Sequence, residues 1–265
     1  MLPCPNAFRS IFRHDDGSYN WKAELDYGFD MVDKASCGSL AALIIEPILS
    51  SGGMHVLPDG YLRAIRKHCD DRSMLLIIDE AQTGLGRTGT MFAFEHDGVT
   101  PDILTLSKTL GNGYPLSVVV TSHAIAKSCQ ERGLFFGTTH VNDPLAAAVG
   151  LRVLGIAIRE SLPERAKMLG DRLVSALEAI KEKNSSIGDI RGRGLLIGVE
   201  IIDGQTRAPN PALGLALCRE MKQNGLWVNF SPTSSTFRIV PPSTTTMLEL
   251  DAGIKIIKSV FQVQD

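Results

Sequence analysis

Short apolar runs alternate with longer stretches of helical periodicity along the N-terminal part of the chain. Runs short enough to be strands are LAALIIEPI from Leu40, MLLIIDEA from Met74, ILTL from Ile103 and LSVVVTS from Leu116. Because these runs are uniformly apolar, they predict strands that are buried on both faces. Strands that alternate with helices indicate an α/β protein with a mainly parallel sheet.

The segment LPDGYLRAIRKHCDDRS, between the first two runs, has the spacing of an amphipathic helix. Leu62, Ile65 and Cys69 fall on one face of that helix. Strand, helix and strand therefore form one βαβ unit. A long stretch of helix formers begins at Asp143, and Pro163 divides it at a predicted domain hinge.

The pattern changes toward the C-terminus. Strands are predicted over GDIRGRGLLIGVEII, WVNF and TFRIVPP, with a helix over LGLALCREMKQNGL and a final helix from Leu248. This mixed order of strands and helices indicates a smaller α+β unit. We therefore predict a large domain over residues 1–160 and a small C-terminal domain over residues 161–265.

Composition excludes several functional classes. The 265 residues are 44% hydrophobic, which is enough for a substantial core. The net charge of −2, without a basic block, does not indicate nucleic acid or a membrane surface as a partner. The five cysteines are scattered and form no Cys-x-x-Cys pair, which indicates reduced thiols. With no signal-peptide pattern and no run near the roughly 20 apolar residues of a membrane span, we expect a cytoplasmic protein with small-molecule partners.

Two charged residues follow apolar runs where a reactive site is expected. Asp79 ends the run from Met74, and Lys108 follows the run from Ile103. Open parallel sheets present functional groups at the carboxyl ends of their strands, so neighbouring strands would bring both side chains to one crevice. Three interpretations are open at this point, namely a solvated turn lysine, a plain ion pair, or a cofactor with a carbonyl group and a basic ring nitrogen.

Pyridoxal phosphate has both of these chemical features. Lys108 would form the Schiff base and later act as a general base. Asp79 would keep the ring nitrogen protonated, so that the ring accepts electrons from a breaking bond. We expect Lys108 to be desolvated, which would favour its free amine. The Gln82 amide could donate to the phenolic oxygen of the cofactor, with helix capping or solvent exposure as the alternative.

Longer motifs resemble one enzyme family. The segments IIEPILSSGG, LLIIDEAQTGLGRTGTMFAFEHDGVTPDILTLSKTLGNGYPL, TTHVNDPLAAAVGLRVL and IRGRGLLIGVEI are similar to class III (ω-type) pyridoxal-phosphate-dependent aminotransferases. Among the subfamilies, the 2,2-dialkylglycine decarboxylases are the most similar. The resemblance spans nearly the whole chain and implies fold type I, the aspartate aminotransferase-like fold. It also implies pyridoxal 5'-phosphate as cofactor and a dimer that builds each active site from two subunits.

The resemblance implies roles for individual residues. Lys108 matches the Schiff-base lysine, Asp79 the partner of the pyridinium nitrogen, and Gln82 the contact of the phenolic oxygen. Thr139 matches a threonine that reaches the cofactor phosphate of the neighbouring subunit. Arg238 matches the arginine that binds the substrate carboxylate, a role that suits its bidentate fork.

Ser51 distinguishes subfamilies within this family. Many ω-aminotransferases have a glutamate at this position, where it pairs with the carboxylate-binding arginine. With a serine there, Arg238 stays available for an α-carboxylate, which favours α-amino acid chemistry and agrees with the decarboxylases. An incidental serine in a turn is the alternative.

The resemblance further implies an alkali-metal site at THVNDP. Asp143 and the carbonyl groups of Thr139 and Val141 would supply hard oxygen ligands. The other ligands belong to an earlier segment of the family pattern, which we expect this chain to lack. The same segment carries the phosphate-binding residues and the aromatic ring that stacks on the cofactor, so the large domain is expected to be partial.

Three functional hypotheses follow from the resemblance. The first is decarboxylation-dependent transamination, in which a dialkylated amino acid becomes a ketone and a keto acid accepts the amino group. The second is ordinary transamination without decarboxylation. The third is a non-catalytic chain that associates with a full-length relative rather than with itself as a homodimer.

Overall fold

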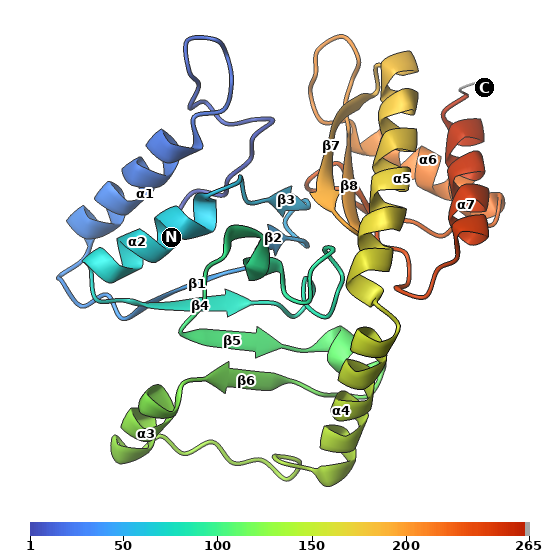
Figure 1. Cartoon of the computed structure of the whole chain (residues 1–265). Coiled ribbons are helices and arrows are strands. Elements are labelled where there is room, and N and C mark those ends of the chain that lie inside the picture. The colour runs from blue at the N-terminus through green and yellow to red at the C-terminus, as the bar shows by residue number, and fades with distance from the viewer. Residues whose placement is uncertain (263–265) are drawn as a thin grey trace.

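Two β-sheets organise the molecule in the computed structural model, which describes residues 1–262 (Figure 1). The first sheet has the order β1-β4-β5-β6, with strands β1 (Ala42–Ile45), β4 (Leu75–Asp79), β5 (Ile103–Leu106) and β6 (Val118–Thr121). The first three of these strands are parallel, and β6 runs antiparallel to β5. The predicted α/β class with a mainly parallel sheet is therefore confirmed.

The second sheet is antiparallel and has the order β7-β8-β10-β9. Its strands are β7 (Ile187–Arg193), β8 (Leu196–Ile201), β10 (Thr236–Ile239) and β9 (Asn229–Ser231). A separate hairpin consists of β2 (Ile48–Leu49) and β3 (His55–Val56). Figure 1 shows the two sheets in separate halves of the molecule, joined by a long helical segment.

Helices α1 (Trp21–Ala35) and α2 (Tyr61–Asp71) cover one face of the first sheet. Their apolar faces pack against Leu76 and Ile78 of β4, which are fully buried. The predicted helical face of Leu62, Ile65 and Cys69 is buried in the same cluster. Since β1 and β4 are parallel and α2 lies between them in the chain, the predicted βαβ unit is confirmed.

The expectation that all four apolar runs are buried on both faces is wrong for β1 and β6. Ile44 of β1 is 64% exposed and Val119 of β6 is 68% exposed. These strands form the two edges of the sheet, and nothing in residues 1–262 covers their outer side chains. The side chains of an apolar run favour burial, but the sequence of the run does not specify which other element packs against them.

The connecting helices break where the sequence predicts. Helix α4 (Pro144–Arg159) ends just before Ser161, whose φ of 48° lies in the left-handed region, and α5 (Leu162–Lys183) has Pro163 in its first turn. Proline is tolerated there because the first turn has no N–H partner to lose. The domain boundary between residues 160 and 161 stays a prediction, although it coincides with this break.

Helices α5, α6 (Pro211–Gln223) and α7 (Met247–Val260) pack on one face of the second sheet around a single apolar cluster. The β2–β3 hairpin covers part of the other face, where Met54 lies against Gly198 so closely that a Cβ there would approach it within 2.5 Å. All six residues of β8 are consequently buried. The hairpin turn is therefore held against the second sheet.

The remaining elements are α3 (His123–Glu131) and the short 3-10 turns η1 (Ala93–Asp97) and η2 (Lys108–Gly111). No helix within the described residues is long and apolar enough to cross a membrane.

Candidate active site

Asp79 and Lys108 follow neighbouring parallel strands. Asp79 is the last residue of β4 and is in register with Thr105 of β5, and Lys108 comes just after β5 has ended. Asp79 is half-buried, and its Oδ1 accepts a hydrogen bond from the Ala81 backbone N–H at 2.9 Å. The predicted adjacency of the two strands is confirmed. The ion pairs within residues 1–262 do not include one between Asp79 and Lys108, so a plain ion pair does not explain their placement.

Lys108 begins the turn η2 in an unusual backbone conformation. Its φ is 48°, in the left-handed region that costs a non-glycine residue free energy. Strained residues persist only where the surrounding structure maintains them, and they cluster at functional sites. The side chain is exposed, which differs from the expected desolvation, and its amine has no hydrogen-bond partner among the described residues. The amine is therefore available to a reacting group.

Glu46 is a third charged residue in this region, and the sequence analysis did not single it out. Burial raises the pKa of its carboxyl group, and the nearby Asp79 raises it further. Opposing effects come from the Ser50 backbone N–H, Lys108 and Arg238. The pKa of Glu46 thus depends on the charges of Asp79, Lys108 and Arg238, which are all predicted site residues. Its position directly after the LAALII run is the same signal that identified Asp79.

Arg238 extends from β10 to the β2–β3 turn and to the segment after β4. Its Nη2 donates to Ser50 Oγ and to Gln82 Oε1, both at 2.9 Å. Ser50 Oγ in turn donates to Gln82 Oε1 at 3.0 Å. The structure thus brings Arg238 and Gln82 into direct contact. Ser50, which is fully buried, completes the triangle, but no local pattern identifies it because Arg238 lies 188 positions away.

The guanidinium of Arg238 keeps its charge unpaired. The ion pairs within residues 1–262 include none to Arg238, and both of its hydrogen-bond partners are neutral. Its Nε is buried without a hydrogen-bond partner in the described part of the chain. A buried donor without a partner costs free energy, so this group favours an incoming acceptor such as a carboxylate.

Ser51 is exposed beside this triangle. Its Oγ accepts a hydrogen bond from Gln82 Nε2 at 3.4 Å, so Gln82 lies between Ser51 and Arg238. Ser51 therefore provides no carboxylate at the position where the family resemblance implies a glutamate in many ω-aminotransferases.

Thr139, Val141 and Asp143 lie in an exposed segment before α4. Asp143 Oδ1 caps that helix by accepting from the Leu145 N–H at 2.9 Å, and its Oδ2 is 3.6 Å from His140 Nδ1. The hydrogen bonds of this segment, within residues 1–262, do not reach Lys108 or Arg238. Within residues 1–262, no group of three or more His, Cys, Asp or Glu side chains could hold a metal ion.

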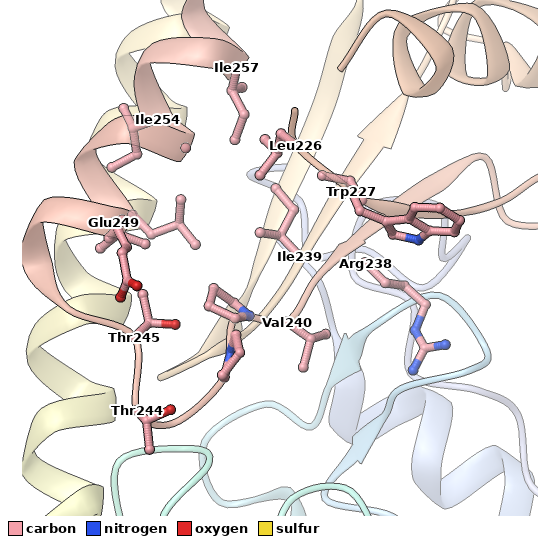
Figure 2. Close-up of a pocket in the computed structure, with 16 residues that line it drawn as sticks. Leu226, Trp227, Arg238, Ile239, Val240, Thr244, Thr245, Glu249, Ile254 and Ile257 are labelled. Carbon is pink, nitrogen blue, oxygen red and sulfur yellow. The ribbon is translucent and has the colours of Figure 1, made fainter. Parts of the chain in front are cut away.

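A cavity of about 420 Å³ lies between β10, α7 and the loop that joins them. Figure 2 shows Leu226, Ile254 and Ile257 along its apolar wall, while the guanidinium of Arg238 points away from them. Arg238 is the only predicted site residue that borders the cavity. We therefore do not assign this cavity to the reactive groups at Lys108 and Asp79.

The chain belongs to the class III aminotransferase family, whose model matches residues 6–261. An uncharacterised aminotransferase of Schizosaccharomyces pombe is 49% identical over 264 residues, which cover 98% of this chain and 59% of that protein. The acetylornithine aminotransferase of Methanocaldococcus jannaschii is 35% identical over 255 residues, or 94% of this chain and 61% of that protein. The chain thus spans about three fifths of the length of these relatives.

Solved structures agree with the family assignment. The acetylornithine aminotransferase of Elizabethkingia anophelis is 34% identical with a TM-score of 0.80, covering 89% of this chain and 60% of that one. The ornithine aminotransferase of Toxoplasma gondii, whose active site contains PLP at partial occupancy, is 32% identical with a TM-score of 0.79, covering 89% and 53%. The predicted fold type I is therefore confirmed, and pyridoxal phosphate (PLP) is the cofactor of this family.

Proposed function

We propose that the protein is a pyridoxal-phosphate-dependent aminotransferase that acts on an amino acid and a keto acid. The observation that supports this most strongly is the placement of Lys108 and Asp79 after neighbouring parallel strands in a class III chain. When bound, the cofactor supplies a ring that accepts electrons from a bond broken at the substrate α-carbon. The residues present fit this group, because they offer an unpaired amine, a carboxylate and a neutral amide donor.

Each of these side chains has a separate task in the proposal. Lys108 holds the cofactor through Nζ and moves a proton once the substrate has displaced it. The Asp79 carboxylate stabilises a positive charge on the ring nitrogen. Gln82 presents its Nε2 donor to the phenolic oxygen, since its Oε1 is already engaged by Arg238 and Ser50.

Arg238 binds the substrate α-carboxylate in this proposal. Its charge is unpaired within residues 1–262, and the adjacent Ser51 is neutral. A glutamate at position 51 would compete for the guanidinium, whereas a serine leaves it free. Substrates with an α-carboxylate are therefore favoured over simple ω-amines.

The finer proposal is decarboxylation-dependent transamination of a dialkylated amino acid, as in the 2,2-dialkylglycine decarboxylases. Ser51 beside Arg238 supports it, while ordinary transamination is the alternative suggested by the acetylornithine and 4-aminobutyrate aminotransferases among the relatives. The substrate 2-methylalanine separates the two activities because its α-carbon has no hydrogen to transfer. Release of carbon dioxide and acetone from it supports decarboxylation, and turnover of alanine alone supports ordinary transamination.

The decisive test is chemical labelling of Lys108. Purified chain is mixed with pyridoxal phosphate, reduced with borohydride and mapped by peptide analysis, beside Lys108→Ala and the exposed control Lys127→Ala. We expect the cofactor on the Lys108 peptide in wild type and Lys127→Ala, and its loss in Lys108→Ala. Label that is spread evenly over surface lysines would contradict the proposal.

We also propose that the chain acts as a homodimer, in which the exposed Thr139 reaches the cofactor phosphate of the partner subunit. The alternative is association with a longer relative as a non-catalytic partner, which the partial coverage of the relatives makes testable. Co-expression with a full-length relative distinguishes the two. A chain that purifies only with itself supports the homodimer, and one that purifies only with the relative supports the alternative.

We propose a cytoplasmic location for the protein. A separate proposal is an alkali-metal ion at Asp143. Asp143 uses Oδ1 to cap α4, and its Oδ2 would have to exchange His140 for the ion, with the carbonyl groups of Thr139 and Val141 as the other oxygen ligands. Potassium should then raise the midpoint of thermal unfolding more in wild type than in Asp143→Asn. An equal response of both proteins would remove the basis for this metal site.

A further inference from the structure

Ser50 contacts both Arg238 and Gln82, the predicted substrate-binding and cofactor-binding residues. Its hydroxyl accepts from Arg238 Nη2 at 2.9 Å and donates to Gln82 Oε1 at 3.0 Å. Its backbone N–H lies near the Glu46 carboxyl group and lowers the pKa of that group. The side chain is completely buried, so water does not compete for these hydrogen bonds.

The chemistry of the three side chains permits only one arrangement of their protons. Arginine has donors and no acceptor, so the atom of Gln82 that faces Arg238 must be the amide oxygen. Ser50 Oγ already accepts from Arg238, and its own proton is therefore directed to the same amide oxygen. The amide group of Gln82 is consequently turned so that Nε2 faces the opposite way, toward Ser51 Oγ at 3.4 Å.

This arrangement has a consequence when a carboxylate binds. A carboxylate that takes the guanidinium of Arg238 withdraws Nη2 from Gln82 Oε1, because charge-assisted hydrogen bonds are stronger than those to a neutral amide. The hydroxyl of Ser50 is then the remaining donor that holds the amide in its orientation. Without it, the amide could rotate and offer its oxygen instead of its nitrogen to the cofactor.

We propose that Ser50 is a positioning residue that couples carboxylate binding at Arg238 to the donor that Gln82 presents to the cofactor. This proposal rests on the proposed function, since Gln82 has a cofactor to contact only if pyridoxal phosphate binds. It assigns no chemical step to Ser50. The role of Ser50 is to fix the direction of one amide group.

The first test measures the hydrogen-bond triangle without any cofactor. Urea unfolding is compared for wild type, Ser50→Ala, Gln82→Leu and the double variant. Because the two side chains share a hydrogen bond, we expect the double variant to lose less stability than the two single variants together. Additive losses would overturn the triangle, whatever the protein does with pyridoxal phosphate.

The second test uses the visible absorption of the pyridoxal-phosphate-loaded full chain as a function of pH, with a saturating carboxylate that lacks an amine, 2-methylpropanoate, present to occupy Arg238. A donor to the ring oxygen withdraws negative charge that otherwise stabilises a proton on the adjoining nitrogen. In Ser50→Ala, loss of the Gln82 donor should therefore raise the pH midpoint of the absorbance change by about half a unit. This shift corresponds to a roughly threefold effect, as expected for one neutral hydrogen bond.

Ser235→Ala is the matched control for this shift. Ser235 is also fully buried and donates one hydrogen bond, to the Ile201 carbonyl at 2.7 Å, outside the triangle. An unchanged midpoint in Ser50→Ala, or an equal shift in Ser235→Ala, would overturn the coupling. A wild-type chain that binds no pyridoxal phosphate would instead overturn the proposed function and the coupling with it, while the unfolding cycle still decides the triangle.

Discussion

Arg238 is held in position by neutral groups, which leaves its positive charge for a ligand. Until a ligand binds, its two partners, Ser50 and Gln82, hold one guanidinium nitrogen through neutral hydrogen bonds that a carboxylate can replace. A lysine at this position keeps the charge but cannot bind two oxygens in parallel.

Arg238→Lys should therefore weaken binding of an α-carboxylate substrate about 10- to 100-fold, the effect of one to two lost charge-assisted hydrogen bonds. We expect this weaker binding to appear as a higher KM in steady-state kinetics with an α-amino acid. Arg219→Lys, on the exposed surface of α6, is the control. A KM that is equal in both variants would exclude Arg238 as the carboxylate-binding residue.

His55 supplies a pH dependence of stability. Burial, followed by the positive charge of Arg191, lowers the pKa of its imidazole from 6.5 to about 4. The unfolded chain therefore binds a proton on this residue more readily than the folded chain as the pH falls from 6.5 to 4. Its contribution, up to about 3 kcal/mol, is present above pH 6.5 and is lost across that interval.

Replacing His55 by glutamine should remove this part of the pH dependence. Urea unfolding at pH 7 and pH 4.5 should show a smaller loss of unfolding free energy in His55→Gln than in wild type. His123→Gln, in which the replaced histidine is exposed, should behave like wild type. If His55→Gln loses as much stability as wild type, another group is responsible.

At the scale of elements, two arginines of the IRGRG motif connect strand β7 to the β2–β3 hairpin and to the segment between β3 and α2. Arg191 Nε donates to the Gly53 carbonyl at 2.8 Å, and its Nη1 pairs with Glu200 at 2.7 Å and Asp189 at 2.8 Å. Arg193 pairs with Asp59. Arg191 thus fixes the turn that contains Ser50, although, among the described residues, the contacts of the two arginines do not include Lys108 or Asp79.

The two arginines should differ greatly in their effect on stability. Arg191→Met leaves Glu200, which is 2% exposed, with one cation fewer and should lower the unfolding free energy by about 3 kcal/mol. Arg193→Met removes a pair whose carboxylate is 90% exposed and should cost less than about 1 kcal/mol. Urea unfolding of both variants checks the difference, and equal losses would show that burial does not determine it.

Element-level predictions from the sequence were reliable where local patterns determine structure. The face of α2 followed from helical spacing, and the neighbouring strands that end near Asp79 and Lys108 followed from two apolar runs. The exposed edges β1 and β6 could not be predicted, because exposure depends on which other elements pack against a strand. Within the site, Ser50 was missed because a hydroxyl gains its role only from Arg238 on a distant strand.

At the scale of the whole molecule, apolar side chains are exposed in the segment between α3 and α4. Leu134, Phe135 and Phe136 are 67%, 88% and 75% exposed. Clustered exposed aromatic residues are typical of protein interfaces rather than of free surface. Thr139, the residue proposed to reach the partner subunit, follows directly in the same segment.

Phe135→Ser with Phe136→Ser should therefore reduce self-association. Sedimentation velocity should show a dimer for wild type and a larger monomer fraction for the double variant at the same concentration. Replacement of Leu248, which is 82% exposed on α7, by serine is the control and should leave the dimer intact. A double variant that remains as dimeric as wild type would place the interface elsewhere.

The left-handed backbone at Lys108 sets the thermal stability of the protein against the reactivity of its lysine side chain. Glycine adopts a φ of 48° without the steric penalty that lysine incurs there, which is about 1 kcal/mol. A Lys108→Gly chain should thus survive heating better than the natural protein while being unable to react with an aldehyde. Glycine would relieve the strain at this position, but only lysine supplies the amine on which the proposed chemistry depends.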